Sequence, residues 1–298
     1  MRFDDRVTGK VSEFCKHGKI VHIDIDPAGI NKTKQAIVPI VSDIRYALAE
    51  LTKMLDAEPT KSGRLPAFNE WLRQIDHWRE TEPLRYADKD HAILPQHAID
   101  RLWQIVRDRG RLGETIVTTG VGQHQMWAAQ YYHFETPQTW FTSGGLGAMG
   151  FGLPAAIGAQ AAHPHKTVID IDGDGSFLMN IQELACAFTE DLPVKVLLLN
   201  NQHLGMVVQW EDRFYASNRG HTYLGAGHDK APYPDFAKIA EGFGVGARQI
   251  SDRTDLDDAL EEMLDSKGPF VLDVLVPYQE HVLPMIPSGQ TVREIIKA

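Results

Sequence analysis

The chain has 298 residues, of which 43% are hydrophobic and 23% charged, with a formal net charge of −10. This composition is typical of a globular protein with a sizeable core, long enough for two domains. Lys and Arg are scattered with no basic block and no apolar stretch reaches 18 residues, so we expect neither a nucleic-acid partner nor a membrane span.

The amino-terminal residues and the cysteines indicate the cellular compartment of the protein. The first residues, Met1 to Arg6, match neither a signal peptide nor a transit peptide. Cys15 and Cys186 are far apart and match no metal-ligand spacing, which suits buried thiols with a structural role in a reducing compartment. We therefore predict a soluble, cytoplasmic protein.

The first third of the chain contains little regular pattern. A strand-like run covers 19–26, and an amphipathic helix covers 42–56 with Ser42 as its N-cap. Residues 1–57 are too few to cover both faces of an α/β sheet, so they read as the tail of a domain. Residues 58–93 are charged and proline-rich with one short helical pattern, and we predict that they form a linker.

From residue 94 to 298 helices and strands alternate. We predict helices at 96–109, 123–131, 153–162, 180–189, 235–243 and 255–264, and strands at 115–119, 167–171, 194–199 and 270–276. Both central strands are continuous apolar runs, which is typical of strands buried on two faces. The fold class is therefore α/β, a doubly wound parallel sheet preceded by the tail of a second α/β domain.

Polar residues follow the two central strands. Asp172-Gly173-Asp174-Gly175-Ser176 comes after the first, and Asn200-Asn201 ends the second. The carboxyl ends of parallel strands share one edge of the sheet, so Asp174 and Asn201 should meet there. A carboxylate and an amide oxygen suit Mg²⁺, which completes its shell with waters and phosphates. Gly-Asp-Gly alone is common in turns, but followed by the Asn pair it indicates a magnesium–diphosphate site.

The run Gly145 to Gly150 matches the G-x-G-x-x-G fingerprint of dinucleotide-binding proteins, and Asp170 lies 20 residues beyond it. We disfavour that interpretation, because the strand before the glycines is short and Asp170 belongs to the strand that feeds the Gly-Asp-Gly turn. The alternative is that the glycines let backbone approach a flat heterocycle, with Met149 as the one large side chain beside it.

Two more turns point to the same edge of the sheet. Gly120 to Gln125 sits where a strand becomes a helix, so its amides can face an anion, and His124 is a candidate diphosphate donor. His203 follows Asn201 and could give its backbone carbonyl to the metal, since Mg²⁺ prefers oxygen to imidazole. Trp210 is in helical phase with Met206 and Val207, which fits core packing or a substrate-pocket wall.

Taken together, these segments resemble the thiamine diphosphate enzymes, and among them the catalytic subunits of acetohydroxyacid synthase, also called acetolactate synthase. Arg2 to Gly9, Gln123 to Gln130 and Gly205 to Trp210 carry the closer resemblance, which extends over essentially the whole chain. It implies that Asp174, Asn201 and the His203 carbonyl hold Mg²⁺. Cofactor contacts are implied for Val121, Gly122, Gln123, His124, Gly147, Met149, Gly173, Asp174, Gly175, Ser176, Asn201, His203, Gly205 and Met206.

The resemblance also implies the reaction and the partners. Members of this family decarboxylate pyruvate on thiamine diphosphate and transfer the two-carbon unit to pyruvate or 2-ketobutyrate, in branched-chain amino acid biosynthesis. Met206, Val207 and Trp210 match the substrate pocket. The family's central domain binds FAD, with matching positions at Arg2, Asp24, Ile25 and Asp43. The resemblance further implies that the protein forms a homodimer and that a small regulatory subunit is a partner.

Two departures from the family pattern limit the activity that we expect of the isolated chain. The pyrimidine domain, with its catalytic glutamate, has no counterpart in the sequence, and most of the FAD-binding domain has none either. We therefore expect no catalytic residue in the chain and no turnover by the chain in isolation. Two alternatives stay open: another thiamine diphosphate enzyme of the pyruvate oxidase or glyoxylate carboligase type, and a non-catalytic assembly half.

Overall fold

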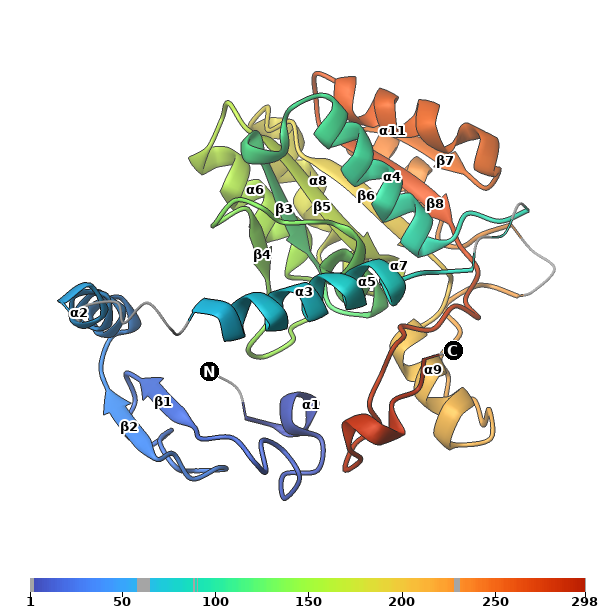
Figure 1. The fold of residues 1–298 in the computed structure, drawn as a ribbon. Helices are drawn as coiled ribbons and strands as arrows, with labels where there is room; N and C mark the ends of the chain where they lie inside the picture. Colours follow the sequence, from blue (N-terminus) through green and yellow to red (C-terminus); the bar gives the residue numbers. More distant parts are fainter. Residues whose placement is uncertain (1–2, 58–64, 88, 90, 228–230, 298) are drawn as a thin grey trace. The chain divides into compact units, whose positions relative to one another are not determined.

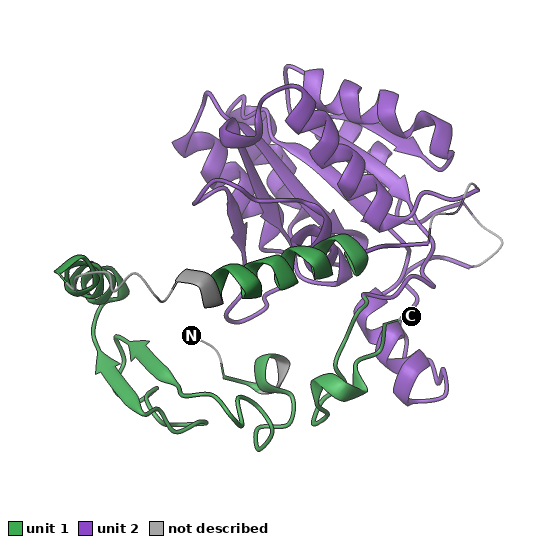
Figure 2. Ribbon diagram, viewed as in Figure 1, with its two compact units in different colours: residues 1–83, 283–298 green, residues 84–282 purple. Residues whose placement is uncertain are grey.

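The computed structural model describes residues 3–57, 65–87, 89, 91–227 and 231–297. The chain divides into two compact units, which Figure 2 colours separately. Unit 1 comprises residues 1–83 and 283–298, and unit 2 comprises residues 84–282. None of the described helices combines the length and apolar composition that a membrane crossing requires.

Unit 2 is built on a six-stranded sheet in which every neighbouring pair is parallel. The spatial order of the strands is β4-β3-β5-β6-β8-β7. The predicted fold class is confirmed. The strands are β3 (Thr115–Thr119), β4 (Trp140–Thr142), β5 (Thr167–Gly173), β6 (Lys195–Asn200), β7 (Gly246–Ile250) and β8 (Phe270–Leu275).

Helices cover both faces of this sheet (Figure 1). The helices of unit 2 are α4 (Pro95–Asp108), α5 (Gln123–Tyr131), α6 (Gly152–Ala162), α7 (Asp174–Phe177), α8 (Leu184–Thr189), α9 (Gly205–Phe214), α10 (Phe236–Gly242) and α11 (Leu256–Asp265). Short 3₁₀ turns lie at Leu112–Glu114, Ile181–Glu183 and Arg253–Asp255.

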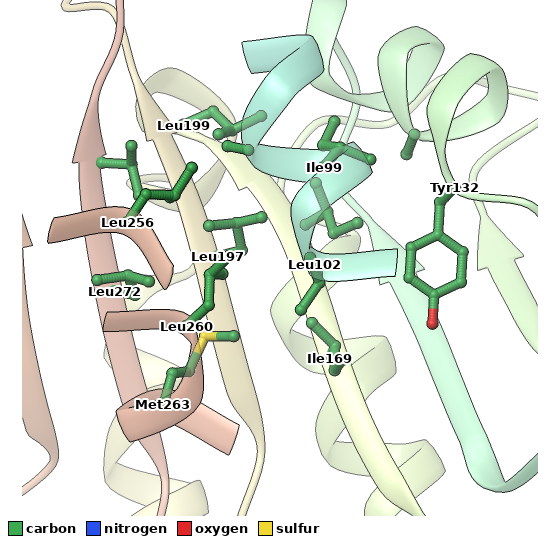
Figure 3. Close-up of a cluster of buried hydrophobic side chains, with 14 of the residues drawn as sticks. Ile99, Leu102, Tyr132, Ile169, Leu197, Leu199, Leu256, Leu260, Met263 and Leu272 are labelled. Atoms are coloured by element: carbon green, nitrogen blue, oxygen red, sulfur yellow. The ribbon is translucent and has the colours of Figure 1, made fainter. Parts of the chain in front are cut away.

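The central strands bury alternate side chains on opposite faces. Ile169, Leu197 and Leu272 pack with α4, α5 and α11 in the cluster drawn in Figure 3. Val196 and Val271 point the other way and pack with α6, α8 and α10. Because both faces need apolar side chains, each of these strands is a continuous apolar run rather than an alternating one. The two cores hold the sheet rigid, so that the turns at its carboxyl edge have a fixed base.

Unit 1 contains a separate small sheet of two parallel strands, β1 (Val21–Asp24) and β2 (Val38–Val41). The chain continues into α2 (Ile44–Ala57) and, beyond the residues not described, α3 (Leu65–Thr81). A short α1 (Asp5–Thr8) precedes the sheet, and the carboxyl-terminal segment of the unit carries the 3₁₀ turn Val292–Glu294.

Several local predictions were wrong. Strands β2 and β7 were missed, because Pro39 interrupts the first pattern and the second is a half-exposed edge strand. Helix α3 is much longer than the short pattern expected there. The N-cap of α2 is Asp43, whose carboxylate accepts from the Arg45 N–H at 2.8 Å, and not Ser42. Cys15 is exposed rather than buried, since it lies in a surface loop with positive φ.

Candidate functional site

The site lies where the strand order of the large sheet reverses. The chain places β4 on one side of β3 and then β5 on the other side, so the crossovers leave in opposite directions. A crevice forms at such a point, outside the carboxyl ends of the strands. The turn after β3 contains Gly120 to Gly122, and the turn after β5 begins at Asp174. The two glycine-containing turns of the sequence therefore face each other.

A pocket occupies this crevice. It is lined by Val121, Gly122, Gln123, His124, Trp127, Met149, Gly173, Asp174, Gly175, Ser176, Leu199, Asn201, His203, Leu204, Gly205, Met206, Val207 and Val276. Every residue for which the sequence implied a cofactor contact is among them except Gly147. Gly147 lies in an exposed loop with φ of 69°, where a Cβ would sit 3.9 Å from the Val121 side chain. The structure thus brings residues that are distant in sequence around one cavity.

Asp174 is the buried carboxylate of the pocket. Its side chain is only 5% exposed, and Oδ1 accepts from the Gly175 N–H at 2.9 Å. Burial raises the pKa of this carboxyl to about 7, because desolvation disfavours the charged form. The backbone N–H of Gln202 acts in the opposite direction, which also places Asp174 next to the turn that follows β6. A cation bound here would restore the ionised form.

The turn after β6 contributes Asn201 and His203 to the same pocket. Asn201 Oδ1 accepts from the His203 N–H at 2.9 Å, so the amide oxygen faces the turn. His203 pairs with Tyr223 in an isolated antiparallel β-bridge. The N–H groups of Leu204 and Leu224 donate the hydrogen bonds of this bridge to the carbonyls of Thr222 and Gln202, so the bridge does not use the His203 carbonyl. The His203 ring stacks on Tyr278 at 4.2 Å, and its Nδ1 lies 2.8 Å from the Asn201 carbonyl oxygen.

This donor set fits Mg²⁺. It offers one carboxylate, one amide oxygen and one backbone carbonyl, all hard oxygen ligands, and leaves room for waters and phosphate. Among the described residues no three His, Cys, Asp or Glu side chains gather closely enough to hold a metal ion, so a Zn²⁺-type cluster is not an alternative within those ranges. The set suits a cation that shares its coordination with a bound phosphate.

The pocket also offers donors for an anion. The first residues of α5 and of α9, Gln123 and Gly205, line it, and the first backbone N–H groups of a helix have no partner within the helix. Ser176 is 1% exposed, and its Oγ accepts from the N–H groups of Val121 at 3.3 Å and Gly150 at 3.1 Å. Its hydroxyl proton is left to donate. A diphosphate fits these groups.

His124 lies beside the buried carboxylate of Asp172. Its Nε2 is 3.1 Å from Asp172 Oδ1, although the two atoms are not aligned for a hydrogen bond. A Cβ on Gly173 would sit 2.6 Å from His124 Nδ1, so only glycine leaves room for the ring. Behind them the pKa of Asp170 is raised well above its usual value by burial and by the charge of Asp172, while Thr118 Oγ1 donates to Asp170 at 3.0 Å.

The expected substrate-pocket residues divide into two groups. Met206 and Val207 line the pocket, whereas Trp210, one turn further along α9, is not among the lining residues and packs on Phe214 at 4.9 Å. Four apolar lining residues could not be recognised from the sequence, because each also belongs to an ordinary core pattern. These are Trp127, Leu199, Leu204 and Val276.

The residues matched to flavin contacts lie in unit 1. Asp24 ends β1 and accepts from the Asp26 N–H at 3.0 Å, and Asp43 follows the adjacent end of β2. Ile25 is 70% exposed beside them. The carboxyl ends of two parallel strands therefore bring Asp24, Ile25 and Asp43 to one edge, a placement that suits hydrogen bonds to ribose or ribityl hydroxyls. Arg2 lies outside the described residues.

Two family models match the chain. The model described as "Thiamine pyrophosphate enzyme, C-terminal TPP binding domain" covers residues 120–274, which include every residue of the pocket except Val276. The model described as "Thiamine pyrophosphate enzyme, central domain" covers residues 1–51.

Curated relatives match over nearly the whole chain. Acetolactate synthase 1, chloroplastic, of Oryza sativa subsp. japonica is 54% identical over 297 residues, which are 99% of this chain and 45% of that protein. Acetolactate synthase 1, chloroplastic, of Nicotiana tabacum is 54% identical over 298 residues, 99% of this chain and 44% of that protein. The chain therefore spans less than half the length of these relatives. The resemblance drawn from the motifs is confirmed.

The same comparison corrects the predicted location. We expected a cytoplasmic protein because the first residues match no targeting segment. The relatives from rice, maize and tobacco are named chloroplastic, which contradicts that prediction. The chain corresponds to only part of each relative, so its first residues do not report on a targeting segment.

Proposed function

Because the chain belongs to the thiamine pyrophosphate enzymes, whose C-terminal TPP-binding domain covers more than half of it, we propose that its pocket holds the diphosphate end of thiamine diphosphate together with Mg²⁺. The observation that carries this proposal is the convergence of Asp174, Asn201 and the N-terminal ends of α5 and α9 on one cavity. Asp174, Asn201 Oδ1 and the His203 carbonyl would be the protein ligands of the metal.

The remaining cofactor contacts follow from the residues around that centre. Ser176 would donate its hydroxyl proton to a phosphate oxygen, and the N–H groups at the start of α5 would neutralise further negative charge. Met149 would support the heterocycle from its partly buried position in the pocket wall. Bound thiamine diphosphate supplies the electron sink for decarboxylation of a 2-ketoacid, while the protein supplies position and electrostatics.

We propose further that the full protein is an acetolactate synthase that joins pyruvate to pyruvate or 2-ketobutyrate. The identity of 54% to plant enzymes of that name supports this activity, as do Met206 and Val207 in the pocket wall. In this proposal residues 1–57 belong to a central domain that binds FAD through Arg2, Asp24, Ile25 and Asp43, residues 58–93 link the domains, and residues 94–298 form the thiamine diphosphate domain. The assembly would be a homodimer, with a small regulatory subunit as a further partner.

The chain alone should not turn over, because none of its residues corresponds to the glutamate of the family's pyrimidine domain. The test is a carboligation assay on the purified chain with pyruvate, Mg²⁺, thiamine diphosphate and FAD, with and without the amino-terminal half of a plant relative. We expect acetolactate only in the mixture. Acetolactate from the chain alone would overturn this expectation. Acetyl phosphate formed by the mixture from pyruvate, phosphate and oxygen, or tartronate semialdehyde formed when glyoxylate replaces pyruvate, would favour another enzyme of the family.

Trp210 should affect the choice of the second ketoacid. Replacing it by Leu removes an aromatic surface one helical turn from the pocket-lining Met206. We expect the complemented Trp210→Leu enzyme to lose about tenfold in its preference for 2-ketobutyrate over pyruvate. Repacking of α9 behind Met206 would change the shape of the pocket wall, and such changes discriminate between similar substrates by roughly that factor. The measurement is the ratio of acetohydroxybutyrate to acetolactate formed from a mixture of both ketoacids. An unchanged ratio would show that Trp210 has no influence on the choice of the second ketoacid.

A further inference from the structure

Gln209 is a buried glutamine whose orientation is fixed by the backbone. On helix α9, at 1% exposure, its Nε2 donates to the Val282 carbonyl at 3.1 Å and its Oε1 accepts from the Val282 N–H at 2.8 Å. A backbone N–H can only donate and a backbone carbonyl can only accept, so the two ends of this carboxamide are unambiguous. Gln209 therefore presents an oxygen, and not a nitrogen, to its other neighbours on that side.

The orientation of Gln209 determines that of Gln123. Gln123 Nε2 donates to Gln209 Oε1 at 3.0 Å and to the Glu280 carbonyl at 2.9 Å. Both partners are acceptors, so the atom that meets them has to be the nitrogen. The oxygen of Gln123 is consequently turned the other way. In the described part of the chain this Oε1 is buried and has no hydrogen-bond partner.

The unpartnered oxygen of Gln123 lies near the side-chain amide of Asn201, beside Gly205. A Cβ placed on Gly205 would collide with Gln123 Oε1 and would lie 2.7 Å from Asn201 Nδ2, so both atoms border the space that this glycine leaves open. One is a buried acceptor in need of a donor, and the other is an amide donor. A hydrogen bond between them would give the Gln123 oxygen the partner that it lacks among the described residues.

The oxygen end of Asn201 is held by the turn that follows β6. Its Oδ1 accepts from the His203 N–H at 2.9 Å, within the turn that carries the His203 carbonyl. A hydrogen bond from Nδ2 to Gln123 would therefore hold the nitrogen away from the metal and the oxygen towards it. Groups behind the ligands commonly fix a metal ligand's orientation in this way.

We propose that Gln209 and Gln123 are positioning residues for the metal site, and that a chain of three carboxamides, Gln209–Gln123–Asn201, is anchored on the Val282 backbone and turns the Asn201 oxygen towards Mg²⁺. This relay rests on the proposed Mg²⁺–diphosphate site. Gln209 touches neither the metal position nor the pocket, since it is not among the lining residues. Its effect on the metal would reach Asn201 only through Gln123.

A double-mutant cycle tests the relay. Mg²⁺ affinity is measured by calorimetry on the purified chain with saturating thiamine diphosphate, for Gln209→Met, Gln123→Met and the double variant. We expect each single change to weaken Mg²⁺ about tenfold, the lower end of the usual effect of removing a group behind a metal ligand, and the double variant to be no worse than the worse single one. If the loss of Mg²⁺ affinity in the double variant equalled the product of the two single losses, the two residues would act independently and the relay would be wrong.

Gln160→Met is the matched control. Gln160 is also 1% exposed and donates to two backbone carbonyls, those of His163 and Lys166, but it lies outside the pocket lining. It should lower the unfolding temperature as the test variants do and leave Mg²⁺ affinity unchanged. If Gln160→Met weakened Mg²⁺ to the same extent, the effect would be one of general destabilisation and the relay would be wrong.

The relay can also be tested without any ligand, which separates its failure from failure of the proposed function. In ¹⁵N spectra of the metal-free chain, the side-chain NH₂ signals of Gln123 and Asn201 are assigned by their loss in Gln123→Met and Asn201→Asp. We expect Gln209→Met to speed hydrogen exchange of the Gln123 NH₂ and to shift the Asn201 NH₂ signal. An unchanged Asn201 signal would overturn the relay, whether or not the wild-type chain binds thiamine diphosphate.

Discussion

Asp174→Asn should abolish Mg²⁺-dependent binding of thiamine diphosphate and at the same time stabilise the empty chain. The substitution keeps the shape of the side chain and removes the one carboxylate among the proposed ligands. A charge-neutral ligand set holds a hard divalent cation weakly, and we expect at least a 100-fold loss of affinity, about 2.7 kcal/mol. Calorimetric titration of thiamine diphosphate at fixed Mg²⁺ measures it.

The stabilisation follows from the pKa of Asp174. Burial raises it to about 7 from 3.8, so the folded state binds the proton more tightly than the unfolded chain does. The contribution of the wild-type carboxyl to stability is therefore fully present below about pH 4 and is lost as the pH rises through about 7. Asn has no such loss, and at pH 8 the metal-free variant should gain up to about 4 kcal/mol in free energy of unfolding.

Asp170→Asn is the matched control for this pair of effects. Asp170 is also fully buried, its pKa is also raised by burial, and it lies on β5, the strand that leads into Asp174, but not in the pocket. We expect it to stabilise the chain at pH 8 without changing affinity for thiamine diphosphate. Equal loss of binding in both variants would show that Asp174 acts through the fold and not as a ligand.

Asp273→Asn should give the second large effect, a gain in stability that depends on pH. Asp273 is completely buried in β8, and burial raises its pKa to about 6 from 3.8. The stability that the protonated carboxyl contributes is present below about pH 4 and is lost as the pH rises through about 6. At pH 8 the substitution should add up to about 3 kcal/mol, because Asn carries no charge and can still accept from Gln249, which donates at 2.7 Å.

Guanidinium unfolding at pH 4 and pH 8 measures this difference. The gain should be near zero at pH 4 and maximal at pH 8, while the exposed Asp258→Asn should change stability by less than about 0.5 kcal/mol at either pH. A gain that is the same at both pH values would show that packing, and not ionisation, is responsible.

The sequence predicted unit 2 well because its pattern has a single physical cause. Strands such as β6 are buried on both faces and therefore apolar throughout, and glycines and caps separate them from the helices. Strands β2 and β7 carry no such signal, because edge and half-exposed strands tolerate polar residues and proline. The length of α3 was underestimated, although its apolar residues recur at helical spacing, at Phe68, Trp71, Leu72, Ile75 and Trp78.

The polar part of the pocket was predictable for the same topological reason. Residues directly after parallel strands share an edge, so Asp174 and Asn201 could be brought together from sequence alone. Gln209 could not be identified this way, because its role depends on a backbone group 73 residues further along the chain. Apolar lining residues such as Val276 resemble core residues until the cavity beside them is seen.

The central claim is that this chain carries the Mg²⁺-diphosphate half of a thiamine diphosphate site. The most direct test is calorimetric titration of the purified wild-type chain with thiamine diphosphate and with thiamine, each in Mg²⁺ and in EDTA. We predict one binding site for thiamine diphosphate in Mg²⁺, at least tenfold weaker binding in EDTA, and no measurable binding of thiamine. Absence of binding, or binding of thiamine as tight as that of its diphosphate, would contradict the claim.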